Sequence, residues 1–259
     1  MLSRSSIDGW KMKGGQLLGR VRDVLLPPTC RSCDRLVGEQ GRLCSQCWSS
    51  TRFIEEPYCP VMGTPFSYDI GAGALSARAI AAPPSFDGAR AVMLYDDVAR
   101  RLVQGLKFSD RTDLAPWMAQ WMVQVAQEQL GPDSIVVLVP LHRTRMFTRK
   151  FNQSAELGRT IAAQSGATFV GHALQRVKAT PQQVGLGRKE RAANVRGAFR
   201  VATEHKILIT GRKVILVDDV FTTGATLDAC SRALRRAGAE HVFCLTFARV
   251  AEGVAVNEL

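Results

Sequence analysis

The sequence has no hydrophobic run long enough to cross a membrane and no recognisable secretory signal. Its N-terminus is polar, and the apolar run from Val24 to Leu26 is far too short for either purpose. We therefore expect a protein without a transmembrane segment that works in the cytoplasm. Thiols stay reduced in that compartment, so the seven cysteines need an explanation other than disulfide bonds.

Acidic residues are scarce in one long stretch of the chain. The whole sequence of 259 residues carries a formal net charge of +11, and its 46% hydrophobic content is that of a globular protein with a core. The stretch from Pro140 to Arg200 contains nine arginines and three lysines but only two acidic residues, Glu156 and Glu190, which gives it a net charge of +10. Charge concentrated in this way predicts an anionic ligand or partner.

Five of the cysteines lie within thirty residues, and four of them form two Cys-x-x-Cys pairs. The pairs are Cys30 with Cys33 and Cys44 with Cys47. Four thiolates at about 2.3 Å satisfy a tetrahedral zinc ion and close the site to substrate, so we predict a structural zinc site. A redox pair is disfavoured, because neither pair follows a strand and opens a helix.

Hydrophobic patterning predicts strands that alternate with helices, as in an α/β domain with a mostly parallel sheet. The apolar run Ile135–Val139, ended by Pro140, is typical of a strand buried on both faces. The remaining expected strands are 91–95, 214–217 and 241–247, and the expected helices are 17–25, 98–106, 114–125, 153–163 and 224–237. Cys230 and Cys244 lie among apolar residues and are expected to be small buried hydrophobes.

The segment from Val217 to Thr226 has the composition of a sugar-phosphate site. A buried strand runs into Asp218 and Asp219, whose carboxylates can accept hydrogen bonds from vicinal sugar hydroxyls. Threonine hydroxyls, a glycine and the amides of a following helix can hold a phosphate, and these are Thr222, Thr223, Gly224, Ala225 and Thr226. A Walker loop is excluded, because no Gly-Lys-Ser/Thr follows.

At these residues the sequence resembles a known family. Val214 to Thr226 looks like the phosphoribosyl pyrophosphate motif of type I phosphoribosyltransferases. Other segments, together with the N-terminal cysteine module, resemble the ComF-type competence proteins: Leu106-Lys107-Phe108, Val139 to Arg145, Arg149 to Gln153, and Gln183 to Phe199. Two positions depart from the family. Lys150 stands where the family usually has glycine, and Met62 replaces the second cysteine of a third pair that begins at Cys59, which favours the four-cysteine site.

The resemblance implies a type I phosphoribosyltransferase-like α/β fold, with a mostly parallel sheet flanked by helices and a small N-terminal zinc-binding module. The expected parts are a loose N-terminus (1–16), a helix plus zinc-ribbon-like cysteine module (17–65), a linker or hairpin (66–86), the transferase-like domain (87–250) and a tail (251–259).

The resemblance also implies a ligand, phosphoribosyl pyrophosphate, with Mg²⁺ held largely by substrate oxygens. Asp218 and Asp219 would bind the ribose, and Thr222 to Thr226 the 5-phosphate. The pyrophosphate side would comprise Pro140, Leu141, His142 and Arg143, and a flexible loop containing Gln183, Arg191 and Asn194 would close over the site.

Three functions follow from the resemblance. The first is a role in natural transformation, with single-stranded DNA and DNA-uptake proteins as partners. The second is an active phosphoribosyltransferase with an unidentified nitrogen acceptor, and the third is a non-catalytic phosphoribosyl pyrophosphate sensor. A glutamine amidotransferase is not expected, because those enzymes carry an N-terminal cysteine nucleophile and this chain begins Met1-Leu2.

Overall fold

The structure is a computed structural model that describes residues 27–108, 111, 113–140, 153–178, 195 and 197–251. Contacts divide the chain into two compact units, Met1–Ser50 and Thr51–Leu259. The helix expected near Leu17 and the C-terminal tail after residue 251 lie outside the described residues. Within the described part of the chain, no helix combines the length and apolarity that a membrane crossing requires.

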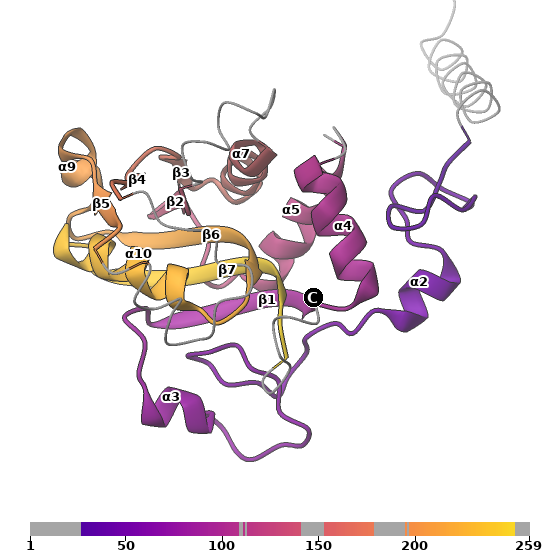
Figure 1. Cartoon of the computed structure of the whole chain (residues 1–259), viewed down its shortest axis with the longest axis horizontal. Coiled ribbons are helices and arrows are strands. Elements are labelled where there is room, and N and C mark those ends of the chain that lie inside the picture. Colours follow the sequence, from indigo (N-terminus) through magenta and orange to yellow (C-terminus); the bar gives the residue numbers. More distant parts are fainter. Residues whose placement is uncertain are drawn as a thin grey trace, which may run out of the picture. The chain divides into compact units, whose positions relative to one another are not determined.

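A five-stranded parallel sheet forms the centre of the larger unit (Figure 1). The strand order is β1-β7-β6-β2-β3, and every neighbouring pair is parallel. The strands are β1 Gly88–Leu94, β2 Ser134–Leu138, β3 Thr168–Phe169, β6 Lys213–Phe221 and β7 His241–Arg249. All five residues of β2 are buried, which confirms the strand expected from its β-branched run. The mostly parallel α/β fold is therefore confirmed.

Helices supply the apolar side chains that cover this sheet. They are α4 Asp97–Phe108, α5 Leu114–Val125, α7 Gln153–Ser165 and α10 Ala225–Arg236. Leu227, Cys230 and Leu234, spaced three and four residues apart along α10, belong to one core cluster with Val214 and Leu216 of β6. The α5 side chain of Trp117 packs on Phe247 of β7, with ring centroids 6.2 Å apart.

Strand β6 is longer than the sequence predicts. The pattern placed its end at Val217, but pairing with β7 continues through Val220 opposite Ala248 and Phe221 opposite Arg249. Backbone pairing to a full-length neighbour holds Asp218 and Asp219 in the strand although acids are unfavourable there. The acids therefore lie at the carboxyl end of a central strand, and only residues 222–224 separate that strand from α10.

Shorter elements complete the larger unit, and the sequence pattern missed them because each spans too few residues for a periodic signal. They are α3 Ala77–Ala81, the antiparallel pair β4 Leu174–Arg176 and β5 Phe199–Val201, the 3₁₀ helix η1 Thr203–His205, and α9 Lys206–Ile209. Helix α3 begins after Ser76, whose hydroxyl accepts a hydrogen bond from the Ala79 amide at 3.3 Å.

Candidate functional site

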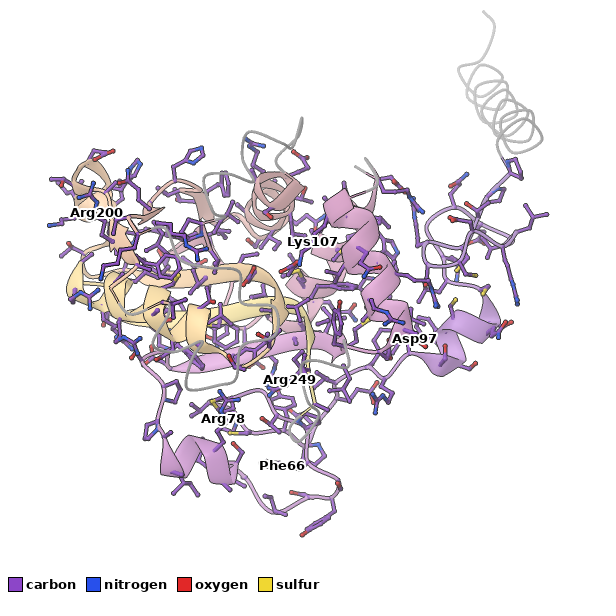
Figure 2. All side chains as sticks on the ribbon, in the orientation of Figure 1. Phe66, Arg78, Asp97, Lys107, Arg200 and Arg249 are labelled. Carbon is purple, nitrogen blue, oxygen red and sulfur yellow. The ribbon has the colours of Figure 1, made fainter. Side chains whose placement is uncertain are left out.

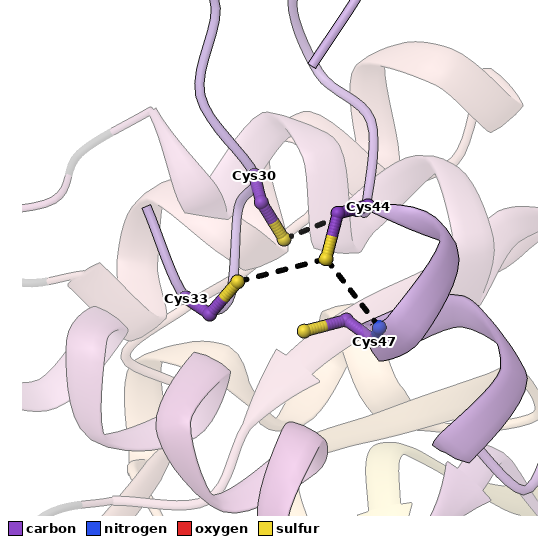
Figure 3. Close-up of side chains that lie close together, drawn as sticks. All are labelled: Cys30, Cys33, Cys44 and Cys47. Carbon is purple, nitrogen blue, oxygen red and sulfur yellow. Dashed lines mark hydrogen bonds between the residues drawn. The ribbon is translucent and has the colours of Figure 1, made fainter. Parts of the chain in front are cut away.

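The four predicted cysteine ligands meet in one cluster within the smaller unit (Figure 3). Their sulfur atoms all lie within 4.8 Å of one another, and the Sγ atoms of Cys33 and Cys44 are 3.6 Å apart. Four sulfurs at about 2.3 Å around one zinc ion would stand about 3.8 Å apart, so the cluster fits a tetrahedral zinc site. The local chain supports the geometry: Thr29 pairs with Leu36 across a tight turn, and helix α2, Ser45–Ser50, follows Cys44.

The electrostatics of the cluster also favour a bound cation. Burial acts to raise the pKa of Cys30, but backbone amides, Cys44 foremost, outweigh it and lower that pKa to about 6. Burial and the neighbouring sulfurs raise the pKa of Cys47 to about 12, because a further thiolate would face like charges. A divalent metal removes this repulsion and takes all four groups as thiolates.

Cys59 and Met62 do not join the cysteine cluster. Both are buried, at 0% and 2% exposure, in the hydrophobic core of the larger unit. They belong to a tight turn in which the Gly63 amide donates to the Cys59 carbonyl at 2.7 Å. The segment from Cys59 to Met62 therefore contributes to the hydrophobic core and not to the four-cysteine cluster. Cys230 and Cys244 are likewise fully buried, as expected.

The acid pair at the end of β6 has a cationic partner. Lys107 lies on α4 (Figure 2), and its Nζ atom forms an ion pair with Oδ2 of Asp219. The side chains of Lys107 and Asp219 keep exposures of 31% and 16%, so the pair is half-buried. Backbone amides also satisfy the acids: Asp219 N–H donates to Asp218 Oδ1 and Val220 N–H to Asp219 Oδ1, each at 3.0 Å.

The two carboxyl groups have opposite pKa shifts. Burial, together with the neighbouring charge of Asp219, raises the pKa of Asp218 well above its usual value. Burial acts on Asp219 as well, but the Lys107 ammonium outweighs it and lowers the pKa of Asp219. Such divergence between adjacent groups is common where a protein holds a ligand or a proton.

The junction between β6 and α10 is a three-residue turn that requires glycine. Gly224 has a φ of 73°, and a Cβ there would lie 2.7 Å from Cζ of the Phe221 ring. Its carbonyl accepts a hydrogen bond from the Asp228 amide at 2.9 Å, so α10 begins immediately after it. Thr222, Thr223 and Thr226 are half-buried at this junction. The sequence had assigned the glycine to close ligand approach, whereas in the structure it also makes room for Phe221.

The remaining predicted site residues are only partly described. Pro140 follows β2 at the same edge of the sheet as Asp218, because the Val139 amide donates to the Val217 carbonyl at 3.0 Å. The other predicted site residues lie outside the described residues: Leu141, His142, Arg143, Gln183, Arg191 and Asn194. Their roles stay predictions.

Sequence reasoning assigned no role to three residues that the fold brings to this region. Lys107 was noticed only as part of the Leu106-Lys107-Phe108 segment, and Arg78 and Arg249 were not singled out. Arg78 donates to the Thr223 carbonyl from a segment 145 residues away. A lysine at the end of an amphipathic helix gives no functional signal by itself. The resemblance of the Leu106-Lys107-Phe108 segment to the family was therefore the signal that could have identified Lys107 as a site residue.

Comparison with protein families gives two matches that agree with this architecture. A double zinc ribbon domain matches residues 21–79, and a phosphoribosyl transferase domain matches residues 162–258. The second match contains the β6–α10 junction. The ribbon match and the four-cysteine cluster together support a structural zinc site.

Relatives match over most of the chain. The DNA utilization protein YhgH of Salmonella typhimurium is 31% identical over 232 residues, which cover 86% of this chain and 98% of the relative. Competence protein F of Haemophilus influenzae is 29% identical over 205 residues, 77% of this chain and 87% of the relative. A solved glutamine phosphoribosylpyrophosphate amidotransferase from B. subtilis is 17% identical over 55% of this chain and 30% of its own, with a TM-score of 0.36. A score of that size supports no conclusion about activity.

Proposed function

The chain belongs to the ComF-type competence protein family, and from this we propose that its β6–α10 junction binds phosphoribosyl pyrophosphate with Mg²⁺. One observation carries the proposal. Two consecutive carboxylates lie near the carboxyl end of a central parallel strand, which ends two residues later at Phe221 and is joined to the first turn of α10 by a three-residue turn. Ligands of open α/β sheets bind at the carboxyl ends of strands, and helix N-termini favour phosphate.

Each part of the junction suits one part of that ligand. Asp218 and Asp219 accept hydrogen bonds from the ribose hydroxyls, while Thr222 to Thr226 donate to the 5-phosphate. Pro140, with the neighbouring Leu141, His142 and Arg143, would lie on the pyrophosphate side, and Gln183, Arg191 and Asn194 would close the site. The pairing of Lys107 with Asp219 adds a positive charge beside the acids, which suits a ligand with several negative charges.

The donor set also fits magnesium. Mg²⁺ prefers oxygen ligands, retains several waters and is commonly held through substrate phosphates and one or two carboxylates. Asp218 and Asp219 are the carboxylates within reach of the proposed ribose position. We therefore assign to Mg²⁺ the neutralisation of phosphate charge, with substrate oxygens as its principal ligands.

The cellular role that we propose is in natural transformation, where the protein would handle imported single-stranded DNA together with DNA-uptake proteins in the cytoplasm. The names of the relatives, a DNA utilization protein and a competence protein, support this role. The +10 stretch between Pro140 and Arg200 offers charge for DNA phosphates. Single-strand binding that falls steeply with salt, about 0.7 log units in affinity per log unit of salt for each phosphate contacted, would support it. Absence of binding at low salt would refute it.

The same junction suits two alternatives, an active phosphoribosyltransferase and a non-catalytic sensor, because both need the intact acid pair and phosphate loop. In the transferase reaction, a nitrogen nucleophile attacks the anomeric carbon of the ribose as the bond to pyrophosphate breaks. Pyrophosphate release measured against a panel of nitrogen nucleophiles separates the two. Release with one acceptor establishes the enzyme, and binding without release favours the sensor.

Titration calorimetry tests the binding itself. Wild type is expected to bind phosphoribosyl pyrophosphate in the presence of Mg²⁺, and the double variant Asp218→Asn/Asp219→Asn to bind it about 100-fold more weakly. Each lost hydrogen bond to a charged group contributes about 1.5 kcal/mol, and about 1.4 kcal/mol corresponds to tenfold in affinity. The matched control is Asp133→Asn, an exposed acid beside β2, which should bind as wild type does. Equal heats in all three proteins, or none in wild type, would end the proposal.

A further inference from the structure

Two arginines from distant segments, Arg78 and Arg249 (both labelled in Figure 2), lie against the ring of Phe221, the last residue of β6. The guanidinium carbon of Arg78, on α3, is 6.0 Å from the ring centroid, and that of Arg249, at the end of β7, is 4.9 Å away. Phe86 meets the same ring edge-on, with centroids 6.2 Å apart. Phe221 is therefore held by aromatic and cationic contacts from three segments outside its own strand.

Each guanidinium also donates to a backbone carbonyl. Arg78 donates to the carbonyl of Thr223, inside the turn between β6 and α10. Arg249, which is 2% exposed, donates to the carbonyl of Met62, inside the Cys59–Gly63 turn. A continuous set of contacts thus links that turn, through Arg249 and Phe221, to Arg78 and the candidate phosphate loop.

The bond from Arg78 determines the direction of one peptide unit. Among the described residues only the Glu56–Pro57 bond is cis, so the unit joining Thr223 and Gly224 is trans. The C=O and N–H of a trans unit point in opposite directions. With the Thr223 carbonyl turned toward Arg78, the Gly224 N–H points away from Arg78.

We propose that Arg78 is a positioning residue of the phosphate loop: by capturing the Thr223 carbonyl, it turns the Gly224 N–H toward the 5-phosphate and keeps a carbonyl oxygen from facing that anion. This inference rests on the proposed function. Arg78 lies inside the region that matches a double zinc ribbon, residues 21–79. The second half of that region therefore contributes to the ligand site without holding a metal, since Cys59 and Met62 lie in the core.

The test compares Arg78→Met, which keeps the aliphatic stem and removes the guanidinium, with Arg78→Lys, which keeps a cationic donor. The matched control is Arg52→Met, at an exposed arginine. Calorimetry is carried out with phosphoribosyl pyrophosphate, with ribose 5-phosphate and with pyrophosphate. Arg78→Met should bind the two ligands that carry a 5-phosphate about tenfold more weakly and pyrophosphate unchanged, because a hydrogen bond to a charged group is lost at one subsite only. Arg78→Lys should recover part of the loss.

The outcomes separate this inference from the proposed function. If wild type fails to bind phosphoribosyl pyrophosphate, the proposed function fails and the inference with it. If wild type binds phosphoribosyl pyrophosphate and Arg78→Met binds each of the three ligands as tightly as wild type does, the inference alone is overturned. An equal loss for pyrophosphate and ribose 5-phosphate overturns it too, because that pattern reports general destabilisation. Should Arg78→Met not fold, as judged by circular dichroism, Arg78→Gln is measured in its place by the same affinity ratio.

Discussion

At the scale of single residues, the acid pair shows how neighbours decide the charge of a group. Asp218 and Asp219 are adjacent in sequence and equal in chemistry. Only Asp219 has the Lys107 ammonium as a partner, so its pKa is lowered, while burial raises the pKa of Asp218. Lys107 thus keeps the Asp219 carboxylate charged, while the neighbouring Asp218 carboxyl favours its protonated form.

The first prediction concerns Lys107→Met. A carboxyl whose pKa is lowered in the folded state contributes stability above its unfolded pKa, about 3.9, and this contribution is lost as the pH falls through the folded value. Removal of the ammonium should therefore lower the free energy of unfolding at pH 7, by only about 1 kcal/mol because the pair is half-buried. Near pH 3 the loss should be smaller, because the carboxylate begins to be protonated there. Urea unfolding across this pH range measures the difference.

The second prediction concerns Asp218→Asn, which should raise the free energy of unfolding where Lys107→Met lowers it. The raised pKa of Asp218 means that its charged form destabilises the fold, and this penalty grows as the pH rises from about 4 toward neutrality. The amide removes the penalty, so the variant should be more stable than wild type at pH 7 and equal to it near pH 4. Asp133→Asn serves as the control at an exposed acid. A gain in stability that does not vary with pH would contradict the assignment.

At the scale of elements, the junction of β6 and α10 joins a strand to a helix in three residues. The turn is this short because β6 continues to Phe221 along β7, and because Gly224 adopts a left-handed conformation before α10 begins. The ring of Phe221 occupies the space where a side chain at Gly224 would stand. Strand length, turn and ring packing therefore depend on one another.

The third prediction compares two glycines with similar backbones. Gly224 and Gly211 have φ values of 73° and 68°, but a Cβ on Gly211 would meet nothing within 4 Å. Gly211→Ala should lower the free energy of unfolding by about 1 kcal/mol, which is the strain of an alanine in the left-handed conformation. Gly224→Ala should cost about 1–3 kcal/mol more, because its methyl group overlaps the Phe221 ring. Chemical denaturation gives both values, and equal losses would show that the ring moves aside freely.

At the scale of the whole molecule, the chain consists of two units with different sources of stability. The larger unit has a hydrophobic core around its sheet, whereas the described part of the smaller unit has few buried apolar residues and a four-cysteine cluster. Domains this small usually need a metal or disulfides to fold. Zinc therefore stabilises the smaller unit in the role that the core has in the larger one.

The fourth prediction concerns the amount and position of zinc. Because four of the described cysteines form one cluster and the described residues hold no second such group, we expect about one zinc ion per chain and not two, despite the double-ribbon match. Cys44→Ser should lose the metal, and Cys59→Ala should retain it, because Cys59 lies in the core of the larger unit. Elemental analysis of protein purified without chelator decides, and two zinc ions per chain, or loss of zinc from Cys59→Ala, would contradict the assignment.

Chemistry that depends on near neighbours could be predicted from the sequence. The spacing of Cys30, Cys33, Cys44 and Cys47 predicted one cluster, and the structure has it. The run of β-branched residues predicted the buried strand β2. The end of β6 was predicted four residues too early, because the pattern of one strand does not include the length of its partner β7. Helix α3 and the pair β4–β5 are too short to leave a periodic signal.

The sequence alone determined the chemical groups of this protein: four thiols in two pairs, two adjacent acids, and the threonines and glycine that follow them. These groups act through caps, turns and backbone conformation, which span a few residues. Only the tertiary structure decided which lysine and arginine side chains contact the acid pair and the turns. The contacts of Lys107 with Asp219, Arg78 with Thr223 and Arg249 with Met62 join positions 112, 145 and 187 residues apart. Strand order and burial bring such positions together, and no local pattern contains either.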